Sequence, residues 1–191
     1  MSGGEQLIRG SLWLRPTGPV LERLQELIRR LTGRFGGTWP RPHVALLGGI
    51  ELQSEGAEAR LEALCARVPP VTVRLGRLEG RNEPLRCFYA VAEPSPELLE
   101  AHRAACEAFG MLAPDAFEAH LPLLYGHIDA PTKQRLAKEL GGRLNLSFVA
   151  NSVHLVNASA AVPVARWHTL HECLLRRAGR HRPPPTRSVS A

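Results

Sequence analysis

Apolar positions along the chain alternate in some stretches and recur every three to four residues in others, which predicts strands and amphipathic helices. The order of these elements runs strand, helix, strand, helix, strand, and then repeats with one strand added, so we expect an α+β fold with a weak internal duplication. Strands are predicted over 8–14, 43–50, 71–75, 85–92, 120–127, 144–156 (broken near Asn151) and 164–174, and helices over 20–31, 54–68, 95–109 and 132–140.

Local signals support the start of two of these helices. Ser95, Pro96 and Glu97 combine a hydroxyl N-cap, a proline in the first turn and an acid favoured by the helix dipole. Ser54 can cap the helix that Pro69 ends.

A short phrase that contains a histidine occurs twice. Residues 42–48 read PHVALLG, and residues 119–126 read AHLPLLYG, so that His120 follows His43 by 77 positions. Each histidine heads an apolar strand, and two such strands side by side would bring both imidazoles into one pocket. Imidazole gives and takes protons near neutral pH. The repeat therefore predicts an acid–base site in a central cleft between two pseudo-symmetric lobes.

Strand alternation extends this prediction to two further positions. Residue i+2 faces the same side as residue i, so Ala45 should share a pocket with His43, and Pro122 with His120. A phosphate-handling site would want a hydroxyl at each position, and neither side chain can donate a hydrogen bond. Pro122 also lacks an N–H, which suits a sheet edge or a bulge.

The remaining histidines and cysteines fit structural roles. His102, His154, His168 and His171 lack the matched context of the repeat and are interpreted as core or surface residues. The cysteines at 65, 87, 106 and 173 form no C-x-x-C pair, so we expect buried reduced thiols, no metal site and no cofactor.

Composition and charge argue for a cytoplasmic globular protein. Hydrophobic residues make up 44% of the chain, no apolar run is long enough to span a bilayer, and the N-terminus does not read as a signal peptide. The net charge is +6, but five arginines after residue 175 leave about +1 for the rest, so the basic balance is only weak evidence for nucleic-acid binding by the folded body. We expect one bilobal domain over 1–175, a disordered basic tail over 176–191, and a monomer that does not bind membranes.

The sequence resembles the two-histidine phosphoesterase superfamily, in particular its cyclic nucleotide phosphodiesterase branch. The resemblance covers about residues 8–175. It rests on the two histidine phrases, which stand where the family has His-x-Thr/Ser motifs, and on further phrases: SLWLRP at 11–16, RCFY at 86–89, FVANSVHLV at 148–156 and Trp167.

The resemblance implies metal-independent hydrolysis of a small cyclic phosphate, either ADP-ribose 1″,2″-cyclic phosphate or a nucleoside 2′,3′-cyclic phosphate. It implies that His43 and His120 are the acid and the base, in an order left open, and that Tyr125 lies near the substrate. Because a nucleotide base needs stacking or apolar contacts, Trp13, Tyr125 and Trp167 are candidate contacts for it. Ala45 and Pro122 depart from the family pattern.

Two alternatives follow from that departure. The chain could be a catalytically weakened or silent relative that binds cyclic phosphates or RNA ends. It could also be a structural or partner-binding protein with incidental histidines. The arrangement of the His43 and His120 rings separates these interpretations.

Overall fold

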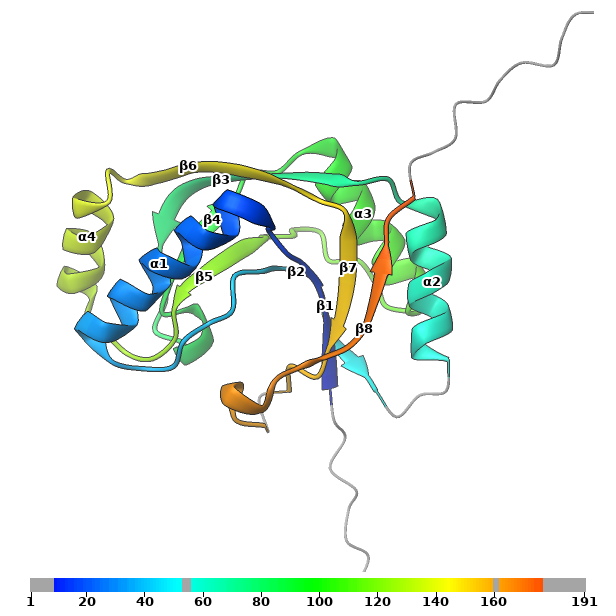
Figure 1. The fold of residues 1–191 in the computed structure, drawn as a ribbon, viewed down its shortest axis with the longest axis horizontal. Coiled ribbons are helices and arrows are strands. Elements are labelled where there is room, and N and C mark those ends of the chain that lie inside the picture. Colours follow the sequence, from blue (N-terminus) through cyan, green and yellow to red (C-terminus); the bar gives the residue numbers. More distant parts are fainter. Residues whose placement is uncertain (1–8, 53–55, 160–161, 177–191) are drawn as a thin grey trace, which may run out of the picture.

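The fold is built on two four-stranded antiparallel sheets, as seen in a computed structural model that describes residues 9–52, 56–159 and 162–176 (Figure 1). The order in the first sheet is β2-β1-β7-β8, and the order in the second is β5-β4-β3-β6. The first sheet contains β1 (Arg9–Leu14), β2 (Val44–Glu51), β7 (Ser152–Val156) and β8 (Thr169–Leu174). The second contains β3 (Val71–Glu79), β4 (Phe88–Ala92), β5 (His120–Leu124) and β6 (Arg143–Ala150).

The predicted α+β fold with two antiparallel lobes is confirmed, and the chain divides between the lobes in a way that periodicity does not reveal. The first and last strands of the chain share one sheet, and the middle strands form the other. Only Asn151 separates β6 from β7, so one continuous ribbon passes from the second sheet into the first (Figure 1). The predicted break near Asn151 is therefore the crossing between the two lobes.

Helices pack across the two sheets and share one core with them. Helix α1 (Gly18–Phe35) connects two strands of the first sheet but packs on β5 and β6 of the second. Helix α2 (Ala57–Arg67) covers β7 and β8, α3 (Pro96–Ala108) contacts β2, β3 and α2, and α4 (Ala130–Glu139) contacts β3. Leu46 of the first sheet and Leu121 of the second belong to the same buried cluster, so apolar burial holds the lobes together.

The predicted element boundaries are right in some places and wrong in others. Ser95 caps α3, because its Oγ accepts a hydrogen bond of 3.2 Å from the Leu98 amide. Helix α2 begins after Gly56, and Ser54 lies outside the described residues.

Three strands are shorter than their apolar patterns predict. Short 3₁₀ helices, η1 (Pro84–Arg86) and η2 (Val164–Arg166), occupy the starts of the strands expected at 85 and 164. One backbone hydrogen bond closes each of these short helices. In η1 the Arg86 N–H donates to the Glu83 carbonyl, and in η2 the Arg166 N–H donates to the Pro163 carbonyl. The strand expected to reach 127 ends at Leu124.

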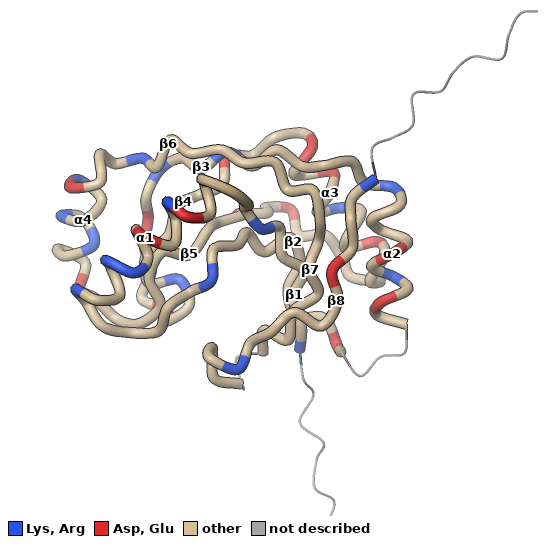
Figure 2. The backbone as a smooth tube through the Cα atoms, viewed as in Figure 1, with Lys and Arg blue, Asp and Glu red and all other residues tan. Residues whose placement is uncertain are grey.

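Within the described ranges, no helix is both long and apolar enough to cross a bilayer. Basic and acidic residues are interspersed along the helices (Figure 2).

Candidate active site

The two histidine strands lie at corresponding edges of the two sheets. His43 directly precedes β2, the edge of the first sheet, and His120 begins β5, the edge of the second, and β2 contacts β5. The segment before β2 is also tied to the end of β5, because the Thr38 amide donates a 3.3 Å hydrogen bond to the Tyr125 carbonyl. Gly37 has φ +90°, and a Cβ there would lie 2.1 Å from that carbonyl oxygen, so the approach requires glycine.

His43 is a buried ring that is held on one face and at one nitrogen. It stacks on Trp13 of β1, with the ring centroids 3.6 Å apart and the planes 12° apart, and it is only 5% exposed. Its Nδ1 lies 2.6 Å from the Arg41 carbonyl oxygen. Because a carbonyl can only accept, Nδ1 must carry the proton, which leaves Nε2 of the neutral ring as a proton acceptor.

His120 repeats this arrangement in a looser form. The neighbouring strand β4 again supplies an aromatic ring, since Tyr89 lies 4.8 Å from His120 between centroids at 55°. The Nδ1 atom again faces the carbonyl of the residue two positions earlier, Glu118, at 3.5 Å. His120 is only half-buried. Its ring is therefore oriented less firmly than that of His43.

The electrostatic surroundings favour the neutral form of both rings. Burial lowers the pKa of His43 to about 3, with opposition from the Arg41 carbonyl and further lowering by the positive charges of His120 and Arg15. Burial also lowers the pKa of His120, assisted by the Arg86 guanidinium and opposed by the Glu118 carbonyl.

The expected hydroxyl positions face the same sites without supplying a donor. Ala45 lies directly opposite Trp13 in the β1–β2 ladder, on the face that holds His43, and packs against an aromatic cluster of Trp13, Tyr125 and Trp167. Pro122 is buried directly opposite Tyr89 in the β4–β5 ladder. Strand β5 is an edge strand, as the missing N–H of Pro122 predicts.

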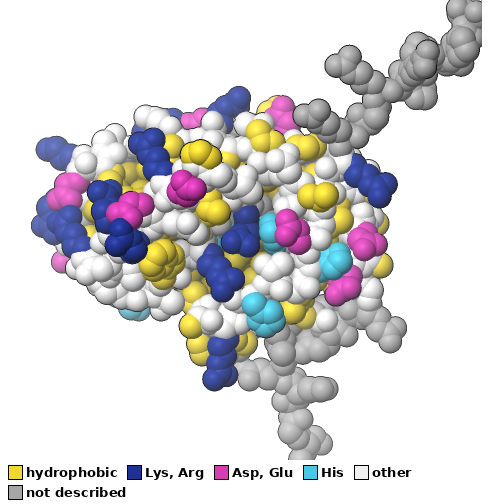
Figure 3. Space-filling view, viewed as in Figure 1, with side chains coloured by type: hydrophobic (Ala, Val, Ile, Leu, Met, Phe, Trp, Pro, Cys, Tyr) yellow, Lys and Arg dark blue, Asp and Glu magenta, His cyan; other side chains and the backbone are white. Residues whose placement is uncertain are grey.

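Arginines lie near both histidines, but among the described residues only those near His120 form ion pairs. Beside His120, Arg81 and Arg86 both pair with Glu118, at 3.1 and 2.7 Å. Beside His43, Arg15 and Arg41 are close enough for the charge of Arg41 to lower the pKa of Arg15, after the larger effect of burial. Figure 3 shows basic and histidine side chains gathered in the middle of this face of the molecule.

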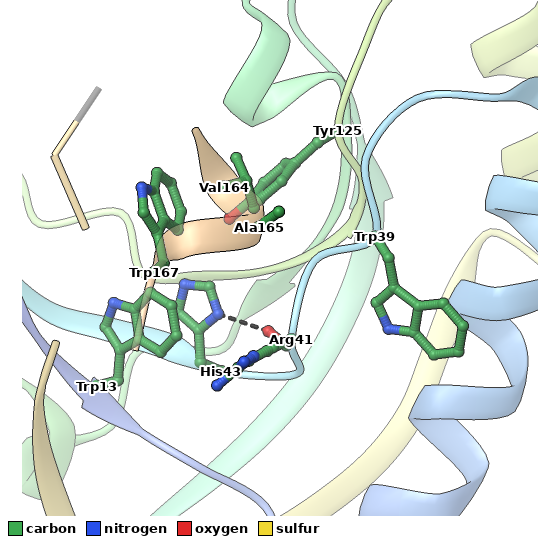
Figure 4. A pocket seen from close by; sticks show the side chains of 8 residues that line it. All are labelled: Trp13, Trp39, Arg41, His43, Tyr125, Val164, Ala165 and Trp167. Carbon is green, nitrogen blue, oxygen red and sulfur yellow. Dashed lines mark hydrogen bonds between the residues drawn. The ribbon is translucent and has the colours of Figure 1, made fainter. Parts of the chain in front are cut away.

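A small cavity of about 70 Å³ opens beside His43 (Figure 4). A pocket for a whole drug-sized ligand takes about 300–1,000 Å³, so this space suits a phosphate group rather than a whole nucleotide. It brings together His43 and the three candidate base contacts, Trp13, Tyr125 and Trp167. His120, Ala45 and Pro122 do not line it. The lining residues are Trp13, Trp39, Arg41, His43, Tyr125, Val164, Ala165 and Trp167.

Sequence reasoning missed several of the residues that surround the histidines. Trp39 and Arg41 lie on the proline-rich segment before His43, outside any apolar pattern, and Trp39 is 42% exposed. Tyr89 lies on β4 and Arg15 directly follows β1, and neither strand carries a motif histidine. Strand alternation offers the signal for Arg15, because it follows Trp13 by two residues.

Two further histidines, His102 and His154, have contacts of their own. His102 is buried, stacks on Phe117 at 3.7 Å and faces the Leu46 carbonyl with Nδ1 at 2.8 Å, which is a structural role. His154 is buried beside Ser152 and Glu172. Within the described part of the chain, no group of three histidine, cysteine or acidic residues could hold a metal ion.

Comparisons with known proteins bear on the family and the fold of the chain. The sequence matches the 2′-5′ RNA ligase superfamily over residues 15–162. A cyclic phosphodiesterase from Arabidopsis thaliana is 25% identical over 170 residues, which cover 86% of this chain and 94% of that protein.

Solved structures share the fold. The Thermus thermophilus protein TT0787 aligns with a TM-score of 0.60 at 20% identity, over 88% of this chain and 98% of its own. E. coli LigT in complex with 3′-AMP aligns with a TM-score of 0.57 at 14% identity, also over 88% and 98%. The chain therefore belongs to the 2′-5′ RNA ligase superfamily, the two-histidine phosphoesterases.

Proposed function

We propose that this protein hydrolyses a cyclic phosphodiester, with ADP-ribose 1″,2″-cyclic phosphate or a nucleoside 2′,3′-cyclic phosphate as substrate and His43 and His120 as the acid–base pair. The observation that carries the proposal is the repeated construction of the two histidines. Each lies at a sheet edge, against an aromatic ring of the next strand, with Nδ1 facing a carbonyl. The name of the Arabidopsis relative, cyclic phosphodiesterase, supports the choice of substrate class.

The environments of the two rings favour His43 as the base. Its buried, neutral ring has a free Nε2, which would take a proton from water as the water oxygen attacks phosphorus. The bond from phosphorus to one ring oxygen breaks, and His120 would give its proton to that oxygen. His120 is the more exposed ring, and a bound phosphate anion would favour its protonated form. Proton return from His43 through solvent would restore both rings.

A second candidate is a binding module for cyclic phosphates or RNA ends that does not hydrolyse them. The observation in its favour is the absence of a donor side chain at both Ala45 and Pro122. A charge-assisted hydrogen bond contributes about 1.5–3 kcal/mol, so two missing hydroxyls would slow turnover unless other groups hold the phosphate.

Turnover with and without the histidines distinguishes the two candidates. The purified protein is assayed in EDTA with 2′,3′-cyclic mononucleotides and ADP-ribose 1″,2″-cyclic phosphate. We expect His43→Ala and His120→Ala each to reduce kcat by about 10²- to 10⁴-fold, the usual contribution of general acid–base catalysis.

His168→Ala is the matched control, because exposed His168 also faces a carbonyl two residues earlier with its Nδ1, at 2.9 Å. It should retain full activity. Product formation equal in the wild type and the His43→Ala, His120→Ala double variant would contradict hydrolysis. Binding without product formation would favour the binding module.

A further inference from the structure

The ring of Tyr89 brings one arginine close to the position where Pro122 leaves the site without a donor. Tyr89 lies directly opposite Pro122 in the β4–β5 ladder, and its ring centroid lies 4.8 Å from that of His120. The Arg86 guanidinium lies over the same ring, with Cζ 5.4 Å from the centroid. Arg86 therefore reaches the same part of the second sheet as His120 and Pro122.

A second shared neighbour, Glu118, fixes Arg86 beside His120. The Glu118 carboxylate accepts a 2.7 Å hydrogen bond from Nη2 of Arg86, and the Glu118 carbonyl faces Nδ1 of His120. The backbone of Arg86 is also held, because its carbonyl accepts a 2.8 Å hydrogen bond from the Arg81 amide and its amide donates to the Glu83 carbonyl at 3.0 Å. A guanidinium held at its backbone and at its tip needs little ordering when a ligand binds.

The hydrogen-bonding capacity of Arg86 is only partly used. Among the residues that the structure describes, the bond from Nη2 is the only one that its guanidinium forms, and its Nε has no partner. Glu118 also pairs with Arg81, so two positive charges share one negative charge and one positive charge is left over. The Arg86 side chain is 23% exposed, so a ligand bound at half-buried His120 can reach it. An anion there would balance the charge and accept the unused hydrogen bonds.

We propose that Arg86 is a further catalytic residue, which donates to a non-bridging oxygen of the phosphate from the side of His120. The inference rests on the proposed function, in which one phosphate contacts both His43 and His120. As water attacks phosphorus and His43 takes its proton, negative charge grows on the non-bridging oxygens. A fixed guanidinium stabilises that charge more than it stabilises the bound substrate. Arg86 thus supplies a donor in the half of the site where Pro122 supplies none.

Steady-state kinetics on a matched pair of arginine variants tests this role. Arg86→Gln and Arg81→Gln each remove one positive charge and one ion pair with Glu118, and of the two arginines Arg86 lies over the Tyr89 ring. With a nucleoside 2′,3′-cyclic phosphate as substrate, we expect Arg86→Gln to lower kcat/KM about 10- to 100-fold, the effect of one charge-assisted hydrogen bond. Arg81→Gln should lower it less than about threefold, because an exposed ion pair contributes little.

Two kinetic results would overturn the role of Arg86. A folded Arg86→Gln variant with the kcat/KM of the wild type would show that the guanidinium does not contact the phosphate. Equal losses in Arg86→Gln and Arg81→Gln would show that both arginines act only through Glu118. Thermal unfolding of each variant establishes that it is folded.

Binding of adenosine 3′-monophosphate separates this inference from the proposed function. A wild type that does not hydrolyse the cyclic phosphates would reject the proposed function, and calorimetry would still test the phosphate contact of Arg86. We expect the Kd to rise about tenfold in Arg86→Gln and to stay within about threefold of the wild type in Arg81→Gln. The same Kd in Arg86→Gln and the wild type would overturn the contact.

A measurement on the unmodified chain covers the case in which Arg86→Gln does not fold. The Nε–H resonance of Arg86, assigned by its loss in Arg86→Lys, is followed by NMR during titration with adenosine 3′-monophosphate. It should shift with the same Kd as the His120 ring, whereas the resonance of Arg30, an exposed residue of α1, should not shift. An Arg86 resonance that is unchanged at saturation would overturn the proposal.

Discussion

The His43 half and the His120 half of the site share one arrangement of contacts, but they differ in how closely these contacts hold the histidine. In both, a histidine at a sheet edge lies against an aromatic ring of the next strand and faces a carbonyl with Nδ1. In the His43 half the ring contact is a close parallel stack, the hydrogen bond is 2.6 Å long and the ring is buried. In the His120 half the rings are tilted, the Nδ1–carbonyl separation is 3.5 Å and the ring is half-exposed.

The two halves also differ in whether the arginines near the histidine are in ion pairs. Among the described residues, Arg15 and Arg41 have no ion-pair partner beside His43, whereas Glu118 occupies the arginines beside His120. The same arrangement at two sheet edges can therefore hold one histidine ring fixed and neutral. It leaves the other ring less constrained and able to gain a proton. Paired general acid–base catalysis requires this difference between its two groups.

Among changes that keep both histidines, restoring the missing hydroxyls should have the largest effect, and the effect should differ between the two halves of the site. We expect Pro122→Ser to raise kcat/KM by about 10- to 100-fold, the value of one charge-assisted hydrogen bond to phosphate. Serine is smaller than proline and fits the space opposite Tyr89. Ala45→Thr should gain less, because added atoms there would press on Trp13 and the aromatic cluster.

Steady-state kinetics on both variants checks this prediction, with Pro122→Ala as the control that changes the backbone without adding a hydroxyl. An equal gain in Pro122→Ser and Pro122→Ala would assign the effect to the backbone. No gain in any folded variant would show that other groups already hold the phosphate.

Removing the ion-pair partner of Arg81 and Arg86 should make the His120 half resemble the His43 half. Its effect on ligand affinity should be smaller than the effect of Pro122→Ser on kcat/KM. Glu118→Gln removes the carboxylate that pairs with Arg81 and Arg86, so adenosine 3′-monophosphate should bind about threefold more tightly. The Glu118 charge raises the pKa of His120, so its loss should lower that pKa further and move the alkaline limb of kcat/KM to lower pH.

Glu139→Gln is the matched control, because it breaks an exposed ion pair with Arg34 at 2.8 Å in a remote part of the molecule. It should change neither the affinity nor the pH profile. An alkaline limb that moves to higher pH in Glu118→Gln would contradict the assignment of His120 as the acid.

Much of this fold could be predicted from local patterns. The alternation at Val71 and Val73 and the cap at Ser95 act within a few residues, and the structure has strand β3 and helix α3 there. The assignment of strands to sheets could not be predicted, because it depends on contacts between distant segments. The strand starts expected at 85 and 164 were wrong because η1 and η2 form in their place.

The candidate site was predicted where it has a repeat and missed where it has none. The repeated phrase identifies His43 and His120, and alternation adds Ala45 and Pro122. Trp39 and Arg41 belong to no quoted phrase, and Tyr89 lies in the phrase RCFY without a predicted role. Trp39 and Arg41 line the cavity beside His43, and Tyr89 contacts His120 because β4 pairs with the edge strand β5. The charge environment of Arg15 is a property of three-dimensional placement, which no local pattern encodes.

Imidazole NMR tests most directly whether the two histidines share one phosphate. The Nε2 resonances of His43 and His120 are followed during titration with adenosine 3′-monophosphate and across pH. In the free protein, burial of the charged form should keep the pKa of His43 near 3 and the pKa of His120 below 6.5. A bound phosphate favours imidazolium, so both pKa values should rise, and both resonances should shift with one Kd. A ligand that shifts only one ring, or two rings with different Kd values, would contradict a shared site.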